Sequence, residues 1–310
     1  MAGLSVIIKK EISDAISNKT FIVAVVVLVA SMILTGAASG DSYYKQREWR
    51  ANMNPQWGEI LIVFNVLPPI RFLGAIVAIA FSFSSINKER AEGSLKVLLS
   101  YPLYRDQVIL GKLAAGLLLI SFVTVVSMGL ALTVYAFVTS ITLTYDLLAR
   151  FSIVTLLATL LLGGYLGLGM ALSIAFKDPK TTLIVVFLFL GLFHSVSFVS
   201  FGNILTNLVF GHEAYYYGSL PWQYADFNNP LAREFQVFVS DLNPSWGFSS
   251  TSFDLGYATK PALINGVNVA LRTDIWVILS EHLNSVAVLV VFPILTYVLS
   301  YIAFNKSDVT

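Results

Sequence analysis

The sequence predicts an all-α integral membrane protein with six transmembrane helices. Hydrophobic residues make up 56% of the chain and charged residues only 12%, whereas soluble domains carry about 25% charged residues. The mean hydropathy is correspondingly high, at +0.77. Almost no formal charge, apart from Arg71 at an edge, falls within the apolar runs. A helix needs about 20 residues to cross a bilayer, and the runs that approach or exceed this length are Thr20–Ala38, Arg71–Ile86, Leu113–Val138, Phe151–Phe176, Thr181–Phe201 and Asn284–Phe304.

An amphipathic segment precedes the first run. Over residues 4–18, apolar side chains share one helical face, while Lys9 and Lys10 fall elsewhere. This pattern favours a helix that lies in the membrane interface, with an ordinary cytoplasmic lead-in as the alternative. The first run is longer than the roughly 7–15 apolar residues of a secretory signal peptide, and further runs follow it. We therefore expect it to be a retained signal anchor.

The distribution of lysine and arginine predicts the orientation of the chain. Short loops rich in these residues face the cytoplasm. One set of loops contains Lys9, Lys10, Lys19, Lys88, Arg90, Lys96, Arg105, Lys177, Lys180 and Lys306, whereas the opposite set has chiefly Lys45, Arg47, Arg50 and Arg150. The balance predicts a multi-pass protein of the cell membrane, surrounded by lipid, with both termini in the cytoplasm. The cluster at Lys45, Arg47 and Arg50 is the opposing signal.

A long segment, residues 202–282, separates the fifth and sixth runs. It is rich in aromatic residues, which flexible linkers lack, and it is interrupted by several prolines. We expect a small folded cap on the extracytoplasmic side, which would shape the exit of a transport path. Packing within the cap and an aromatic belt at the membrane interface are the alternative roles for any single aromatic residue.

No catalytic or metal-binding motif is recognisable in the chain. A GxxxxGK[ST] phosphate loop is absent, because Gly111-Lys112 lacks the upstream glycine and is followed by Leu113. The sequence has no HExxH motif and no cysteine, and its three histidines are widely separated. His194 falls inside the fifth run, where a titratable group can mark a proton path. Without an intramembrane carboxylate or second histidine, a helix-packing role is the better interpretation.

The scarcity of charge in the runs also argues against ion-coupled transport, which usually needs ionisable or broken-helix sites near mid-membrane. Any energy for transport would then come from a separate protein. Two other classes stay open: an intramembrane enzyme, for which His194 and nearby serines are the candidates, and a membrane scaffold without transport. The net charge of +1 is spread over loops and gives no indication of nucleic-acid binding.

A charged elbow, residues 87–107, lies between the second and third runs. A charged hairpin cannot lie in hydrocarbon, so it must sit at the membrane surface. Leu95, Leu98 and Leu99 form an apolar stripe at helical spacing, and Pro102 ends the helix because the residue before proline disfavours the helical conformation. The elbow is thus predicted to present a short amphipathic helix to the groove of a cytoplasmic partner.

The elbow resembles the hallmark segment of ABC type-2 permeases, the membrane subunits of a large class of ABC exporters. The family pattern has an acidic residue, Glu-Gly-Thr-Leu, a Leu-Leu pair, a proline, an arginine and a Gly-Lys at the third span. Ser94 stands where threonine is commoner and keeps the hydroxyl. The matching residues are Glu89, Glu92, Gly93, Leu95, Leu98, Leu99, Pro102, Arg105, Gly111 and Lys112.

The layout of the whole chain also resembles this family, which implies a single transmembrane permease domain over residues 1–310. The order of features is similar to the branch associated with maturation of multicopper enzymes. A chain with no cysteine, five methionines and three scattered histidines offers no evident copper path, however.

The resemblance implies an exporter of two permease subunits and two ATP-binding subunits. A homodimer of this chain is the simpler expectation, and a heterodimer is the alternative. ATP and Mg²⁺ would bind to the ATPase, and this chain would carry no cofactor and catalyse no reaction. The ATPase would dock on Glu89, Arg90, Glu92, Gly93, Ser94, Leu95, Leu98, Leu99, Pro102 and Arg105.

Small residues recur at four-residue spacing in the fourth run, at Gly163, Gly167 and Ala171. Such spacing lets two helix backbones approach closely in a membrane. The contact is predicted either between two permease subunits or between helices of one subunit.

Overall fold

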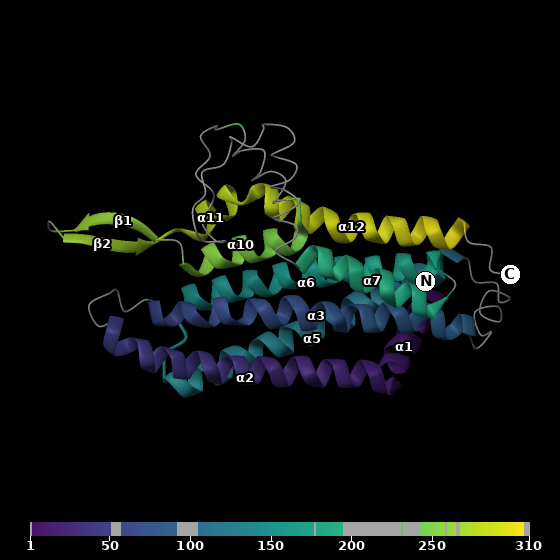
Figure 1. Cartoon of the computed structure of the whole chain (residues 1–310), viewed down its shortest axis with the longest axis horizontal. Helices are drawn as coiled ribbons and strands as arrows, with labels where there is room; N and C mark the ends of the chain where they lie inside the picture. Colours follow the sequence, from purple (N-terminus) through teal and green to yellow (C-terminus); the bar gives the residue numbers. More distant parts are fainter. Residues whose placement is uncertain are drawn as a thin grey trace.

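The computed structural model describes residues 2–50, 57–91, 105–176, 178–194, 231, 242–257, 259–264 and 267–306. The chain is mostly helical (Figure 1). The helices are α1 (Ala2–Ser17), α2 (Lys19–Arg50), α3 (Trp57–Ala91), α5 (Arg105–Thr139), α6 (Tyr145–Ala175), α7 (Pro179–His194), α10 (Pro244–Tyr257), α11 (Ile275–Glu281) and α12 (Leu283–Lys306). The strands are β1 (Thr259–Ile264) and β2 (Val267–Arg272).

Five of the described helices are long and apolar enough to cross a membrane, which confirms the predicted helical membrane class. These segments are Lys19–Tyr44, Asn65–Phe83, Asp106–Thr139, Tyr145–Ala175 and Leu283–Lys306. The apolar part of α7, Lys180–Gly191, is shorter than a full span. The fifth run, Thr181–Phe201, continues into residues outside the described part of the chain, so six complete spans remain a prediction.

Helix α6 lies among the other spans and makes its most extensive contacts with α12 and α3. Two glycines permit the close approach to α12. A Cβ atom added at Gly164 would lie 2.0 Å from the Phe292 ring, and one added at Gly167 would lie 2.4 Å from Thr296 Oγ1. The hydroxyl of Ser300 donates a hydrogen bond to the Gly167 carbonyl, at 2.8 Å. The glycine-rich face of α6 is therefore occupied by α12 of the same chain.

The N-terminal helix α1 crosses one end of the bundle, here called the α1 end (Figure 1). Asn18 separates α1 from α2, and its side-chain oxygen accepts a hydrogen bond from the Thr20 backbone. Helix α1 packs against the first part of α5, where a Cβ atom at Gly111 would lie 2.6 Å from Ile7. The end of α12 reaches the same region.

The opposite end of the bundle carries α10, the β1–β2 hairpin and α11, and is here called the hairpin end (Figure 1). Helix α10 packs against α12, α3 and α6. The two strands are antiparallel, in register from Thr259↔Arg272 to Ile264↔Val267, and they project beyond the helices. The all-α prediction did not include this hairpin. It lies inside the predicted insertion, residues 202–282, of which the structure describes residue 231 and most of the part from residue 242 onward.

Candidate functional site at the α1 end

The predicted elbow is described only at its two roots. Glu89 and Arg90 lie in the last turn of α3, and Arg105 is the first residue of α5. The residues between these roots lie outside the described part of the chain, namely Glu92, Gly93, Ser94, Leu95, Leu98, Leu99 and Pro102. The roots are nevertheless informative, because a group of buried charges joins them.

At the centre of this group is Lys112, about two turns into α5. Its side chain is fully buried, with 0% exposure. The Nζ atom donates a hydrogen bond to Glu11 Oε1 of α1 at 2.6 Å, and it lies 2.9 Å from Glu89 Oε2 of α3. One ammonium group therefore connects three helices at the roots of the elbow.

Lys10 closes the group into a ring. Its Nζ atom donates to Glu89 Oε1 at 2.5 Å and lies 3.7 Å from Glu11 Oε1. Lysines and glutamates alternate around what we call the four-charge ring (Lys10, Glu11, Glu89 and Lys112). Two positive and two negative charges make it formally neutral, which limits the energetic penalty of burying it.

The members of the ring differ in exposure. The side chains of Glu11 and Glu89 are 5% and 11% exposed, whereas that of Lys10 is 40% exposed. Lys10 also lies 3.7 Å from Asp14, which is itself exposed. Three of the four charges are therefore shielded from water, and Lys10 forms the solvent-facing corner.

The ring keeps Glu89 ionised. Burial alone would raise the pKa of this carboxyl, but the charges of Lys112 and Lys10 and their hydrogen bonds outweigh burial and hold the pKa below its ordinary value of 4.5. For Lys10, burial acts to lower the pKa, and the hydrogen bond and charge of Glu89 reverse this effect and raise it. Both groups therefore remain charged at neutral pH.

Apolar side chains pack beside the ring. Ile7 of α1, Ile86 of α3 and Val108 of α5 belong to one buried cluster, which extends to Phe304 of α12. Asn305 of α12 also donates to Asp106 of α5, at 2.8 Å. The elbow roots are thus attached to the bundle by both apolar packing and ion pairs.

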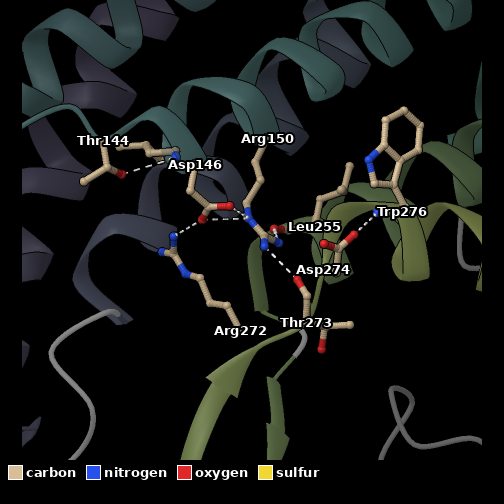
Figure 2. A network of polar contacts seen from close by, with 9 residues as sticks. Thr144, Asp146, Arg150, Leu255, Arg272, Thr273, Asp274 and Trp276 are labelled. Atoms are coloured by element: carbon tan, nitrogen blue, oxygen red, sulfur yellow. Dashed lines mark hydrogen bonds and ion pairs between the residues drawn. The ribbon is translucent and has the colours of Figure 1, made fainter.

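A second network of charges lies at the hairpin end (Figure 2). Arg150 of α6 is 4% exposed. Its Nε donates to Asp146 at 3.0 Å, its Nη1 to the Leu255 carbonyl at 2.9 Å and its Nη2 to the Thr273 carbonyl at 2.7 Å. Arg272 donates to Asp146 as well. Because residues 255 and 273 flank the hairpin, Arg150 joins both of its ends to the first turns of α6.

The other predicted residues are placed as follows. Gly167 faces α12. A Cβ atom at Gly163 would lie 3.3 Å from Leu117 of α5 and 3.5 Å from the Tyr297 hydroxyl of α12. Ala171 is partly buried further along α6. Among the residues that the structure describes, no group of three histidine, aspartate or glutamate side chains could hold a metal ion. His194 ends α7, and its side chain lies outside the described atoms.

Sequence reasoning missed Glu11 and Lys10 as partners of the elbow. Glu11 and Lys112 are 101 residues apart, and Lys10 and Glu89 are 79 residues apart. No spacing rule connects such positions. The one available signal was a lysine next to a long apolar run, which calls for a nearby counter-charge.

The fold and these charge networks define a multi-pass helical membrane protein without a recognisable catalytic centre in its described part. A family model described as ABC-2 family transporter protein matches residues 5–309. The chain belongs to this family, and it is a membrane-spanning permease subunit of an ABC transporter. The family implies association with an ABC ATP-binding subunit. No curated protein matches the chain.

Proposed function

We propose that this chain is the permease subunit of an ABC exporter, and that a separate ATPase docks on the elbow, residues 87–107. The observation that carries the proposal is the four-charge ring. A loop that receives force from a partner must be attached to the spans that it moves. The ring and the apolar cluster beside it provide this attachment at both roots of the elbow.

The elbow and both termini lie in the cytoplasm in this proposal. The excess of lysine and arginine in the loops at the α1 end supports this orientation. The start of α5, the end of α12 and the helix α1 lie together there, so one orientation serves all of them. The hairpin end would then face the extracytoplasmic side.

The ATPase would supply ATP and Mg²⁺ chemistry, and the permease would supply the path. Binding and hydrolysis of ATP would displace the elbow and change the arrangement of the spans. Two copies of the permease would form the path, with a homodimer favoured and a heterodimer as the alternative. The glycine face of α6 contributes to packing inside one subunit, which leaves other helices for the contact between subunits.

Co-purification tests the proposal. The tagged chain is extracted from its native membrane in mild detergent, and its partners are identified by mass spectrometry. We expect an ATP-binding subunit in near-equal amount. A chain recovered alone in several detergents would contradict the proposal and favour an intramembrane enzyme or a scaffold.

A matched pair of variants locates the docking surface. Leu98→Asp places a charge in the apolar stripe of the elbow and should abolish recovery of the ATPase. Leu143→Asp places the same charge on a residue that is 46% exposed at the hairpin end and should leave recovery unchanged. Equal recovery with both variants would exclude the elbow as the docking surface.

A further inference from the structure

Two of the four residues in the four-charge ring come from a helix that lies outside the elbow. Glu11 and Lys10 come from α1, whereas Glu89 and Lys112 lie at the two roots of the elbow. Helix α1 also rests on α5 through Ile7 and Gly111. Helix α1 is therefore joined to α3 and α5 through charges that are mostly shielded from water.

We propose that Lys112 is a positioning residue that makes α1 move together with the two roots of the elbow. The inference rests on the proposed function, because it assumes that an ATPase displaces the elbow. Lys112 would bind no substrate and no nucleotide. Its task would be to keep Glu11 and Glu89 paired with one ammonium group, so that α1 follows α3 and α5 during each cycle.

The geometry favours Lys112 over Lys10 in this role. Lys112 is fully buried and contacts carboxylates of two other helices, whereas Lys10 is 40% exposed and lies on the same helix as Glu11. Separating Lys112 from either carboxylate would break a close charge–charge contact at a site shielded from water, which is unfavourable. The three helices therefore stay joined through Lys112, while the corner at Lys10 can exchange with water.

Stability alone does not explain why this site contains a ring of buried charges. Well-packed apolar residues of similar volume are often as stabilising as a buried ion pair or more so. Apolar contacts between α1 and α5 are already present at Ile7. What the ring adds is attachment between particular charged groups of three helices, and this is the property that a transmission path requires.

Single-cysteine labelling can test the inference, because the natural chain has no cysteine. Val6→Cys places an environment-sensitive fluorophore on α1, at a residue that is 66% exposed. Leu110→Cys places the same fluorophore on α5 near the root of the elbow, at a residue that is 49% exposed. Each permease is reconstituted with its co-purified ATPase, and emission is compared without nucleotide and with ATP, Mg²⁺ and vanadate.

With the ring intact, the emission of both fluorophores should change when ATP, Mg²⁺ and vanadate are added. In Lys112→Met, the Leu110→Cys label should still respond, whereas the response of the Val6→Cys label should be lost. Lys112→Arg keeps the charge and should retain part of the α1 response. Lys9→Met is the matched control, because Lys9 is an exposed lysine on the same helix. In this variant the emission change of the Val6→Cys label should be as large as in the natural background.

A second variant separates transmission from folding. Glu11→Gln, Glu89→Gln and Lys112→Met together remove the three buried charges of the ring and leave only Lys10, which is 40% exposed and lies 3.7 Å from Asp14. We expect this triple variant to fold and to bind the ATPase, yet to lose the α1 response. An α1 response equal to that of the natural chain, in the triple variant or in Lys112→Met, would overturn the inference. If neither label responds when the ring is intact, the proposed function itself fails.

Discussion

The two ends of the molecule use buried charge in different ways. At the α1 end, the four-charge ring joins side chains to side chains, and all four members are ionisable. At the hairpin end, Arg150 binds the carbonyls of Leu255 and Thr273 as well as Asp146. The planar guanidinium of arginine fixes several directions at once, whereas a lysine ammonium is a compact point charge on a flexible stem.

The chemistry of the two cations indicates which end of the molecule is suited to movement. A lysine can keep two carboxylates while the helices that carry them shift by small amounts, because its hydrogen bonds have no fixed plane. An arginine that binds two backbone carbonyls loses bonds when either carbonyl moves. We therefore interpret the four-charge ring as a joint between moving helices, and the Arg150 network as a rigid attachment of the hairpin to α6.

The largest expected effect is that of Lys112→Met. Removing one partner of a buried ion pair typically costs about 3–5 kcal/mol, and here Glu11 and Glu89 would both lose the same ammonium. The free energy of unfolding, measured with denaturant in detergent, should fall by about this amount. The triple variant Glu11→Gln, Glu89→Gln and Lys112→Met, which keeps no buried charge of the ring, should recover most of the loss. Natural stability in Lys112→Met would show that water already reaches the ring.

The second effect is that of Arg150→Met, which should be smaller and more local. Hydrogen bonds to charged groups contribute about 1.5–3 kcal/mol each when removed, but Asp146 is 42% exposed and keeps Arg272 as a partner. Hydrogen exchange should accelerate near residues 255 and 273 and stay unchanged in α2. Arg150→Lys should not restore protection, because one ammonium cannot reproduce the three bonds. Uniform acceleration across all spans would contradict a local role.

The third effect concerns acid. The folded-state pKa of Glu89 lies below its ordinary value of 4.5, so Glu89 stabilises the fold above that value and loses this contribution as pH falls through the folded-state pKa. Glu89→Gln should therefore be less stable at neutral pH and should lose less stability on acidification. Thermal unfolding midpoints measured from neutral to acidic pH give the slope of stability against pH for the natural chain and for Glu89→Gln. Parallel slopes would mean that protonation of Glu89 is not linked to folding.

The smallest effect is expected for Lys10→Met. Solvent-exposed ion pairs contribute about 0–1 kcal/mol, and Lys10 is 40% exposed. Its loss should change the unfolding midpoint little and should become undetectable in high salt, which screens exposed charges. A loss as large as that of Lys112→Met would show that the solvent-facing corner is as essential as the buried one.

The elbow illustrates how far sequence reasoning reaches. Its charge and its position between two apolar runs predict that it lies at a membrane surface. Glu89 lies in the last turn of α3, and Arg105 begins α5. The third span was predicted to begin at Leu113, yet the apolar helix begins earlier and includes Lys112. Sequence patterns treat a lysine as a boundary, whereas the fold buries it because two carboxylates neutralise it.

The hairpin illustrates a different kind of miss. Two short segments rich in valine, leucine and isoleucine flank Asn265-Gly266, which is a strong local signal for a hairpin. The aromatic residues around it predicted a compact cap instead. The signal was present in the sequence, but only the structure shows that Arg150 attaches both ends of this hairpin to α6.

The amino-acid sequence is sufficient to predict a multi-pass helical membrane protein, because the hydropathy of about 20 consecutive residues is a local property that decides whether a helix is stable in the bilayer. It also carried the family resemblance of the elbow, which lies in one continuous segment. The pairing of the buried charges, in contrast, depends on how the helices pack in three dimensions. Lys112 donates a hydrogen bond to Glu11, 101 residues away in the sequence, because α1 packs against α5. No local sequence pattern specifies that contact.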